Sequence, residues 1–312
     1  MLDSASKAFF HLIAHSGVLK TLASRYGMRR QRSFARRFIA GESVVEAIEA
    51  ARILESKHLL LTLDFLGESV TNLEQADAAT REYLHVIYAI VASGIERNIS
   101  LKLTQLGLDV DKASAVDNLR KILERAEPAG FFVRIDMENS PYTDVTLDIF
   151  ETLWNHGYRQ IGVVLQSALR RSEQDLRRIN ALGARVRLVK GAYKEPKSVA
   201  YHKKADVDAA YVRMMQTLLL EGHYPAIATH DRPMISATQQ FARERNIPSN
   251  RFEFQMLYGI RRDLQTALVR EGYRVRVYVP FGREWFPYFM RRLGERPANV
   301  AFVIRGIFGE SG

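Results

Sequence analysis

Two adjacent arginines and a glutamate near the C-terminus form the most distinctive chemical pattern of the chain. They lie in the segment YFMRRLGERPAN, residues 288–299. At about 100° of rotation per helical residue, Arg291, Arg292 and Glu295 share an arc of roughly 100° on one face of a predicted helix. Two guanidinium groups suit a carboxylate or a phosphate, and a nearby acid can bind an amine or hold an arginine in place. The pattern therefore fits an amino acid ligand, although an exposed helix with an intrahelical Arg/Glu pair would look the same.

Short apolar runs, each followed by a helix-length interval, supply the scaffold for that helix. The runs end at Asp64, Thr104, Asp136, Gln166, Gly191, His230, Met256 and Val279. Parallel strands need crossover connections whose helices cover the sheet, so the pattern predicts an α/β chain folded as a (β/α)8 TIM barrel. A doubly wound open sheet is the competing architecture. Helices are expected over residues 145–158, 172–183 and 206–222, the last two ending at a glycine.

Length and composition fit one such barrel with additional helices. The chain has 312 residues, of which 47% are apolar, and this is an ordinary size for a single barrel. No Pro/Gly/Ser-rich linker or charge block divides it. We therefore expect residues 1–55 to form extra N-terminal helices packed on the barrel, and residues 56–312 to form the catalytic (β/α)8 barrel.

Polar side chains gather at or near the C-terminal ends of the predicted strands. A barrel builds its active site at this end, where a purely structural strand has little use for such groups. The clustering therefore predicts a polar pocket there. Its members are Lys102, Asp136, Gln166, Arg187, Lys190, His230, Gln255 and Tyr278.

Three strings resemble the proline dehydrogenase family, in its monofunctional, flavin-dependent bacterial type. They are FFVRIDMEN (131–139), RLVKGAY (187–193) and the C-terminal YFMRRLGERPAN, and they occur in the family's order. The resemblance covers roughly residues 60–305. It implies a distorted (β/α)8 barrel that binds FAD at the C-terminal ends of its strands. The implied reaction oxidises L-proline to Δ1-pyrroline-5-carboxylate, the first step of proline catabolism, and passes electrons to membrane quinone.

The same resemblance assigns roles to individual residues. Arg291 and Arg292, with Lys102, would bind the substrate carboxylate, and Tyr278 would pack against the pyrrolidine ring. Glu295, in the same C-terminal string, joins this substrate group. The expected flavin contacts are Met137, Gln166, Arg187, Lys190, Gly191, Ala192, Thr229, His230 and Gln255. Glu68 resembles the acid that pairs with the first arginine of the pair and closes the site as a gate.

Elementary chemistry supports a redox cofactor. Oxidising a secondary amine to an imine removes a hydride, and no protein side chain is a two-electron acceptor. No G-x-G-x-x-G follows a predicted strand, which argues against a nicotinamide in the standard dinucleotide fold. Arg187 beside a flavin would favour its reduced, more negative state. Asp136 could act as a general base or could orient Lys102 or Arg291 through an ion pair, and the sequence leaves both roles open.

Other functions compete with this interpretation. Lys190 at a strand end also suits a Schiff-base aldolase, in which burial beside Arg187 would lower the pKa of the amine. The basic stretch from Lys20 to Arg37 could instead make the chain an adaptor for nucleic acid or an anionic membrane, although no aromatic platform or zinc-finger spacing supports nucleic acid. His11 and His15 are four residues apart, but no glutamate follows His11 and no third ligand is evident, so no metal site is expected.

Cysteine usage and hydropathy bound the expected location. The chain has no cysteine and no run of about 20 apolar residues. An acid at Asp3 and histidines within the first apolar stretch argue against a secretory signal. We therefore expect a cytoplasmic protein. Peripheral attachment to the inner face of the membrane through the basic stretch 20–37 is a further expectation, because quinone lies in the membrane.

Overall fold

The computed structural model describes residues 35–67 and 70–294, and within these ranges the chain forms a closed parallel barrel. The strands follow one another around the barrel in chain order, and β8 pairs with β1 through Leu61 opposite Val277 and Leu63 opposite Val279. This closure confirms the predicted (β/α)8 barrel and rules out the open sheet. The strands are β1 (Leu60–Phe65), β2 (Asn98–Leu101), β3 (Phe132–Ile135), β4 (Ile161–Gln166), β5 (Arg185–Val189), β6 (Ala226–Ala228), β7 (Glu253–Leu257) and β8 (Val275–Phe281).

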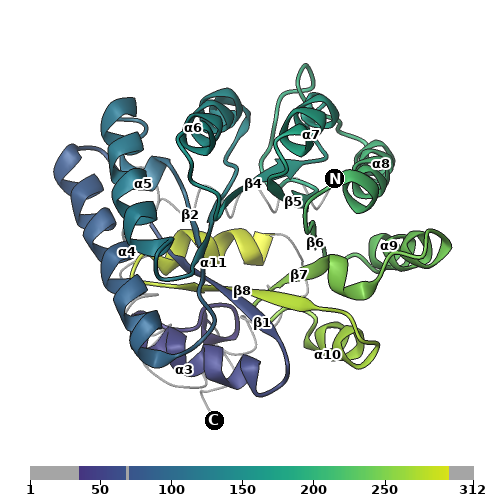
Figure 1. Cartoon of the computed structure of the whole chain (residues 1–312), viewed down its shortest axis with the longest axis horizontal. Coiled ribbons are helices and arrows are strands. Elements are labelled where there is room, and N and C mark those ends of the chain that lie inside the picture. The colour runs from purple at the N-terminus through teal and green to yellow at the C-terminus, as the bar shows by residue number, and fades with distance from the viewer. Residues whose placement is uncertain (1–34, 68–69, 295–312) are drawn as a thin grey trace, which may run out of the picture.

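Helices surround the strands as the outer layer (Figure 1). They are α3 (Val44–Glu55), α4 (Leu73–Ser93), α5 (Lys112–Ala126), α6 (Thr143–Asn155), α7 (Ser172–Ala181), α8 (Lys204–Glu221), α9 (Arg232–Glu244) and α10 (Arg262–Arg270). A further helix, α11 (Trp285–Gly294), follows β8. The three helices expected from the sequence are present as α6, α7 and α8. Gly183 follows α7 with φ +72°, as expected of a C-terminal glycine. Gly222 after α8 instead has φ −79°, and a Cβ there would lie 2.5 Å from the Leu218 carbonyl oxygen, so close packing explains this glycine.

Alternation along the strands divides the barrel into an apolar outer surface and a polar interior. Residues such as Ile99, Val133 and Val277 are fully buried beneath the helices. The residues that alternate with them along each strand point into the barrel. There the Ser100 hydroxyl lies 3.0 Å from Arg187, and the Arg276 guanidinium binds Glu253. The barrel interior is therefore filled largely by charged and hydroxyl groups.

The helix α3 occupies the part of the outer layer next to β8 and β1. Ser43 caps it, and Glu46 completes a capping box with the Ser43 backbone. Before α3, a short 3-10 turn, Ala35–Arg37, leads to a segment tied to the barrel by a hydrogen bond from Ala40 N to the Pro280 carbonyl oxygen at 2.9 Å. Residues 1–34 lie outside the described residues, so the expected boundary at residues 55/56 stays a prediction.

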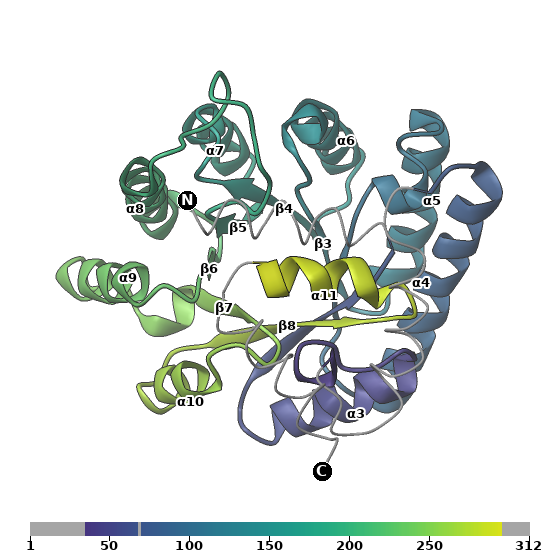
Figure 2. The ribbon, with the colours of Figure 1, turned by 180° about the vertical axis from the view of Figure 1, so that it is seen from behind.

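The helix after β8 does not join the outer layer but lies across the C-terminal end of the barrel (Figures 1 and 2). Its aromatic residues Trp285, Phe286 and Phe289 are buried in a small cluster, separate from the main core, that includes Phe38. The Trp285 indole N–H donates to Glu42 Oε1 at 2.9 Å. This cluster, which we call the mouth cluster, fixes α11 above the strand ends.

Candidate active site

A carboxylate that follows β3 lies at the centre of the polar network at the C-terminal end of the barrel. Oδ1 of Asp136 accepts a hydrogen bond from Nη1 of Arg187 at 2.6 Å, and Oδ2 accepts one from the Tyr278 hydroxyl at 2.8 Å. Nζ of Lys102 is 3.8 Å from the same Oδ2. Side chains from four different strands or strand ends therefore meet at Asp136, as their positions in the sequence predicted.

Arg187 is fixed on several sides within the barrel interior. Besides Asp136, it donates from Nε to Oε1 of Gln255 at 2.5 Å and from Nη2 to the Ser100 hydroxyl at 3.0 Å. Its guanidinium carbon is 5.3 Å from the centre of the Tyr278 ring. Only 5% of the residue is exposed. Arg187 is therefore a preorganised positive charge in a site from which water is largely excluded.

Asp64, at the end of β1, is the second buried carboxylate of the network. Both of its oxygens lie near Nζ of Lys102, at 3.3 and 3.4 Å. Burial raises the pKa of Asp64, and the negative charge of Asp136 acts in the same direction, while Lys102 opposes the shift. No role was predicted for Asp64 from the sequence. The signal was present, because Asp64 ends the first predicted strand just as Asp136 and Gln166 end later ones.

Tyr278 connects this network to the helix above it. Burial, together with the negative charges of Asp136 and Asp64, raises the pKa of Tyr278 well above its ordinary value, so its hydroxyl remains a hydrogen-bond donor. The ring packs against the mouth cluster. Tyr278 therefore lies between the network around Asp136 and α11, while its expected contact with the pyrrolidine ring stays a prediction.

The two arginines of the C-terminal string lie on α11 as predicted. Arg292 is 9% exposed, and its guanidinium carbon is 5.1 Å from the centre of the Tyr288 ring one turn earlier. Arg291 is half-buried. Because α11 crosses the C-terminal end of the barrel, both arginines are carried by the element that covers the strand-end network (Figure 2).

Gln166 and Gly191 lie together on neighbouring strand ends. Nε2 of Gln166 donates to the Glu138 carbonyl oxygen at 2.7 Å. Gly191 has φ +116°, and a Cβ at this position would lie 3.0 Å from Oε1 of Gln166. The backbone conformation and the close approach both favour glycine, which leaves the exposed main chain of Gly191 open to a ligand.

The other residues expected to contact a cofactor lie at the same end of the barrel. The Thr229 hydroxyl accepts a hydrogen bond from the Asp231 N–H at 3.0 Å, and Nε2 of His230 accepts one from the Leu257 N–H at 2.8 Å. Met137 is buried and Ala192 is exposed. The first hydrogen bond lies within the loop after β6, and the second ties this loop to the end of β7.

Lys190 is held in an ion-pair cluster rather than in an apolar pocket. Its Nζ is 2.5 Å from a carboxylate oxygen of both Asp208 and Asp231. Although partial burial opposes ionisation, the hydrogen bonds from Lys190 and Lys204 lower the pKa of both carboxyls. Two ion pairs hold Nζ of Lys190 in place, whereas a Schiff-base lysine needs its amine nitrogen free to attack a carbonyl. The geometry therefore argues against the aldolase alternative.

Several predicted features lie outside the described residues. They are the gate residue Glu68, the substrate residue Glu295, the histidines His11 and His15, and residues 20–34 of the basic stretch. Among residues 35–67 and 70–294, no group of three or more His, Asp or Glu side chains is arranged to bind a metal ion. None of the helices described there is long and apolar enough to cross a bilayer.

Comparison with known proteins decides the family. The sequence model of the family described as Proline dehydrogenase matches residues 47–305. The chain belongs to this family. It is 43% identical to Proline dehydrogenase 2 of Bacillus subtilis (strain 168) over 302 residues, covering 97% of this chain and 98% of that protein. It is also 43% identical to Proline dehydrogenase of Deinococcus radiodurans over 279 residues, covering 88% of this chain and 90% of that protein.

Solved structures agree with the sequence comparison. The crystal structure of proline utilization A (PutA) from Bdellovibrio bacteriovorus, inactivated by N-propargylglycine, superposes with a TM-score of 0.79 at 29% identity. The match covers 89% of this chain but only 34% of that chain, so the present protein spans about a third of that longer one. The network around Asp136 is thus the candidate active site of a proline dehydrogenase, and proline is the substrate of such enzymes.

Proposed function

We propose that the protein binds FAD noncovalently and oxidises L-proline to Δ1-pyrroline-5-carboxylate. The observation that carries this proposal is the convergence of Lys102, Arg187 and Tyr278 on Asp136 beneath a helix that bears two arginines. This arrangement offers fixed positive charge for a carboxylate and for an electron-rich cofactor beneath one helix.

The residues around the strand ends fit a flavin. Gly191 presents exposed main chain that no side chain covers, beside the amide of Gln166. Arg187 and Gln255 form a hydrogen-bonded pair close by in the barrel. When bound, FAD supplies the two-electron acceptor that the oxidation of a secondary amine requires. We propose that Arg187 and Gln255 lie near its ring, and that Met137, Gln166, Lys190, Gly191, Ala192, Thr229 and His230 complete its site.

Proline would bind between the strand ends and α11. Arg291 and Arg292, together with Lys102, would hold its carboxylate, because forked and permanently charged donors match that group. Tyr278 would pack against the ring. Glu68 and Glu295 would belong to the gate and the substrate site.

The geometry favours a positioning role for Asp136 over a general base. Both of its oxygens already accept a hydrogen bond, one from Arg187 and the other from Tyr278. Each oxygen keeps a second lone pair, but the two donors already fix the orientation of the carboxylate, which suits a residue that holds its neighbours in place. We infer that Asp136 holds Arg187 and Tyr278 in place, so that proline has to bind with its amine already deprotonated.

The direct test is an anaerobic titration of the purified protein with L-proline, followed by flavin absorbance. Bleaching of the visible bands, with pyrroline-5-carboxylate recovered from the mixture, is the expected outcome. A protein that releases no FAD on denaturation, even after reconstitution with FAD, would remove the proposal. As the electron acceptor we propose membrane quinone, and a soluble quinone analogue should reoxidise the bleached enzyme.

A further inference from the structure

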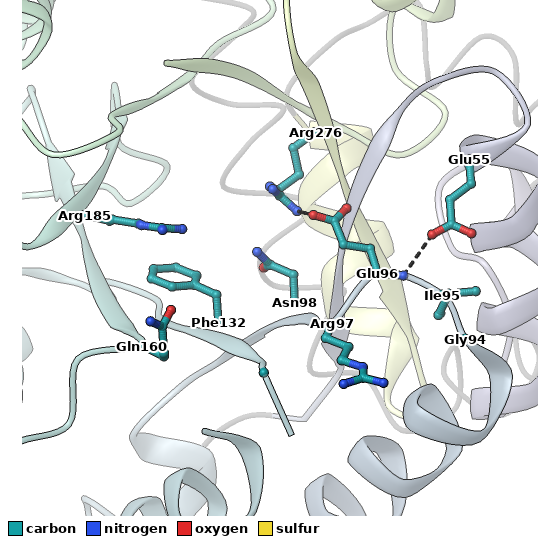
Figure 3. Close-up of a pocket in the computed structure, with 11 residues that line it drawn as sticks. Glu55, Gly94, Ile95, Glu96, Arg97, Asn98, Phe132, Gln160, Arg185 and Arg276 are labelled. Carbon is teal, nitrogen blue, oxygen red and sulfur yellow. Dashed lines mark hydrogen bonds and ion pairs between the residues drawn. The ribbon is translucent and has the colours of Figure 1, made fainter. Parts of the chain in front are cut away.

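The N-terminal end of the barrel, opposite the candidate active site, carries an open depression lined by arginines. Two adjoining cavities of about 570 and 490 Å³ meet there and share Glu96, Arg185 and Arg276. Arg97 also lines the first cavity and Arg274 the second. Figure 3 shows Arg185 and Arg276 extending from different strands toward the same space. The arginines that line this depression therefore outnumber its acidic residues, Glu55 and Glu96.

One of these arginines is fully compensated by its neighbours. Arg276 donates to both oxygens of Glu253, at 2.7 and 3.0 Å, and to Oε1 of Glu96 at 2.7 Å. The second oxygen of Glu96 accepts the Leu61 N–H at 2.8 Å. Arg276, Glu253 and Glu96 thus satisfy one another's hydrogen bonds and together carry one net negative charge, whereas Arg97, Arg185 and Arg274 carry three positive charges.

The remaining arginines contact rings and carbonyl or hydroxyl oxygens instead of carboxylates. None of the ion pairs found among the described residues includes Arg97, Arg185 or Arg274. Arg185 is half-buried, and its guanidinium carbon lies 4.9 Å from the ring centre of Phe132 and 5.3 Å from that of Tyr224. Burial lowers the pKa of Arg185, and the negative charge of Glu253 offsets part of this shift.

Tyr224 shows a further sign of a built site. Its φ is +47°, a left-handed conformation that is uncommon for an aromatic residue. In this position its ring lies beside both Arg185 and Arg274, and its hydroxyl accepts a hydrogen bond from Arg274 Nη1 at 3.2 Å. Backbone strain of this kind persists where the surroundings enforce it and is concentrated at ligand sites.

We propose that this depression, lined by Arg97, Arg185 and Arg274 together with Phe132 and Tyr224, is a binding site for a small phosphate-bearing anion. Guanidinium groups offer paired donors that match phosphate oxygens, and a dianion would compensate the half-buried charge of Arg185. The arginines line two adjoining cavities rather than an extended stripe, which favours a small ligand over a nucleic acid. The site is separated from the network around Asp136 by the length of the barrel.

The test uses the protein with its cofactor bound, so that the cofactor's own phosphate contacts are occupied. Inorganic phosphate and pyrophosphate are titrated by calorimetry at constant ionic strength against chloride. We expect saturable binding that weakens about tenfold in Arg185→Gln and in Arg274→Gln, because each loses a charge-assisted contact. Arg243→Gln, the same charge change at an exposed position on α9, should bind like the wild type.

Two outcomes would overturn the proposal. One is the absence of saturable binding beyond that of chloride. The other is equal affinity in the wild type and in Arg274→Gln, which would place any bound phosphate elsewhere, for example at the catalytic end. Arg185→Gln also removes packing on Phe132 and could fail to fold for that reason. In that case Arg274→Gln and the charge-retaining Arg185→Lys decide the question. Arg185→Lys should bind with intermediate affinity, since it keeps the charge but loses the fork.

Discussion

Replacing Asp136 separates a positioning role from acid–base catalysis. The side chain is 12% exposed and pairs with Arg187 at 2.6 Å. Removing one partner of a buried ion pair costs about 3–5 kcal/mol, and the residual exposure places Asp136→Ala at the lower end, about 3 kcal/mol. Asp136→Asn keeps an acceptor for Arg187 but loses the negative charge and the acceptor that Tyr278 uses. We therefore expect the free energy of unfolding to fall by about 2 kcal/mol.

Urea denaturation and thermal melting measure these losses. At about 2 °C per kcal/mol for a chain of this size, the melting temperature should fall by about 6 °C for Asp136→Ala and by about 4 °C for Asp136→Asn. Asp148→Asn is the matched control, because its side chain is 57% exposed on α6 and should change stability by at most about 1 kcal/mol. Both Asp136 variants should also bind the analogue tetrahydrofuroic acid more weakly, since Tyr278 loses its anchor.

The opposite pattern would refute the reasoning. If Asp136→Asn melted like the wild type and bound the analogue equally well, yet failed to reduce the flavin, Asp136 would be a base rather than a positioning residue. A pH profile of turnover that lost its acidic limb in this variant would support the same conclusion.

The remaining predictions concern substrate, pH and membrane. Arg291→Met and Arg292→Met should each raise KM for proline roughly tenfold to a hundredfold, from a charge-assisted hydrogen bond of about 1.5–3 kcal/mol, and unchanged KM in both would contradict the assignment. Although burial opposes it, Arg276 lowers the pKa of Glu253, so the carboxylate stabilises the fold above its ordinary pKa of 4.5 and this contribution disappears as the pH falls through the lowered value. Acid denaturation curves of Glu253→Gln should accordingly depend less on pH. Binding to anionic vesicles, measured by sedimentation, should weaken as salt is added and after charge reversal within residues 20–37. Equal binding by the wild type and the charge-reversed variant would exclude that segment as the anchor.

The sequence predicted the barrel because its strands are strongly patterned, but it concealed what fills the barrel. In β2, the runs around Ile99 and Leu101 identified a strand, while Ser100 between them looked like an ordinary small residue. Its hydroxyl in fact contacts Arg187, which is 87 positions away in the chain. Local patterns report which face of a strand is apolar, whereas a contact across the barrel depends on the register of several strands at once.

The candidate site was predicted in its members more than in its connections. The strand-end position identified Lys102, Asp136 and Tyr278, and the structure brings them together. The sequence could not show that Lys190 faces two aspartates, because Asp208 and Asp231 lie on other elements. The ion pair of Lys102 with Asp64 was missed for the same reason, as the pairing is visible only once the barrel closes.

The mouth cluster also bears on how the protein reaches its active form during synthesis. Phe38, near the start of the described chain, packs against Phe289 near its end, and Gly41 accepts a hydrogen bond from Gly282. Contacts between residues so far apart in sequence form late and slow folding, because a long loop must close first. When only the first seven strands have emerged from the ribosome, the chain therefore has neither a closed barrel nor a helix over its strand ends. We expect the ability to bind substrate to be acquired in a final step, after β8 and α11 have emerged.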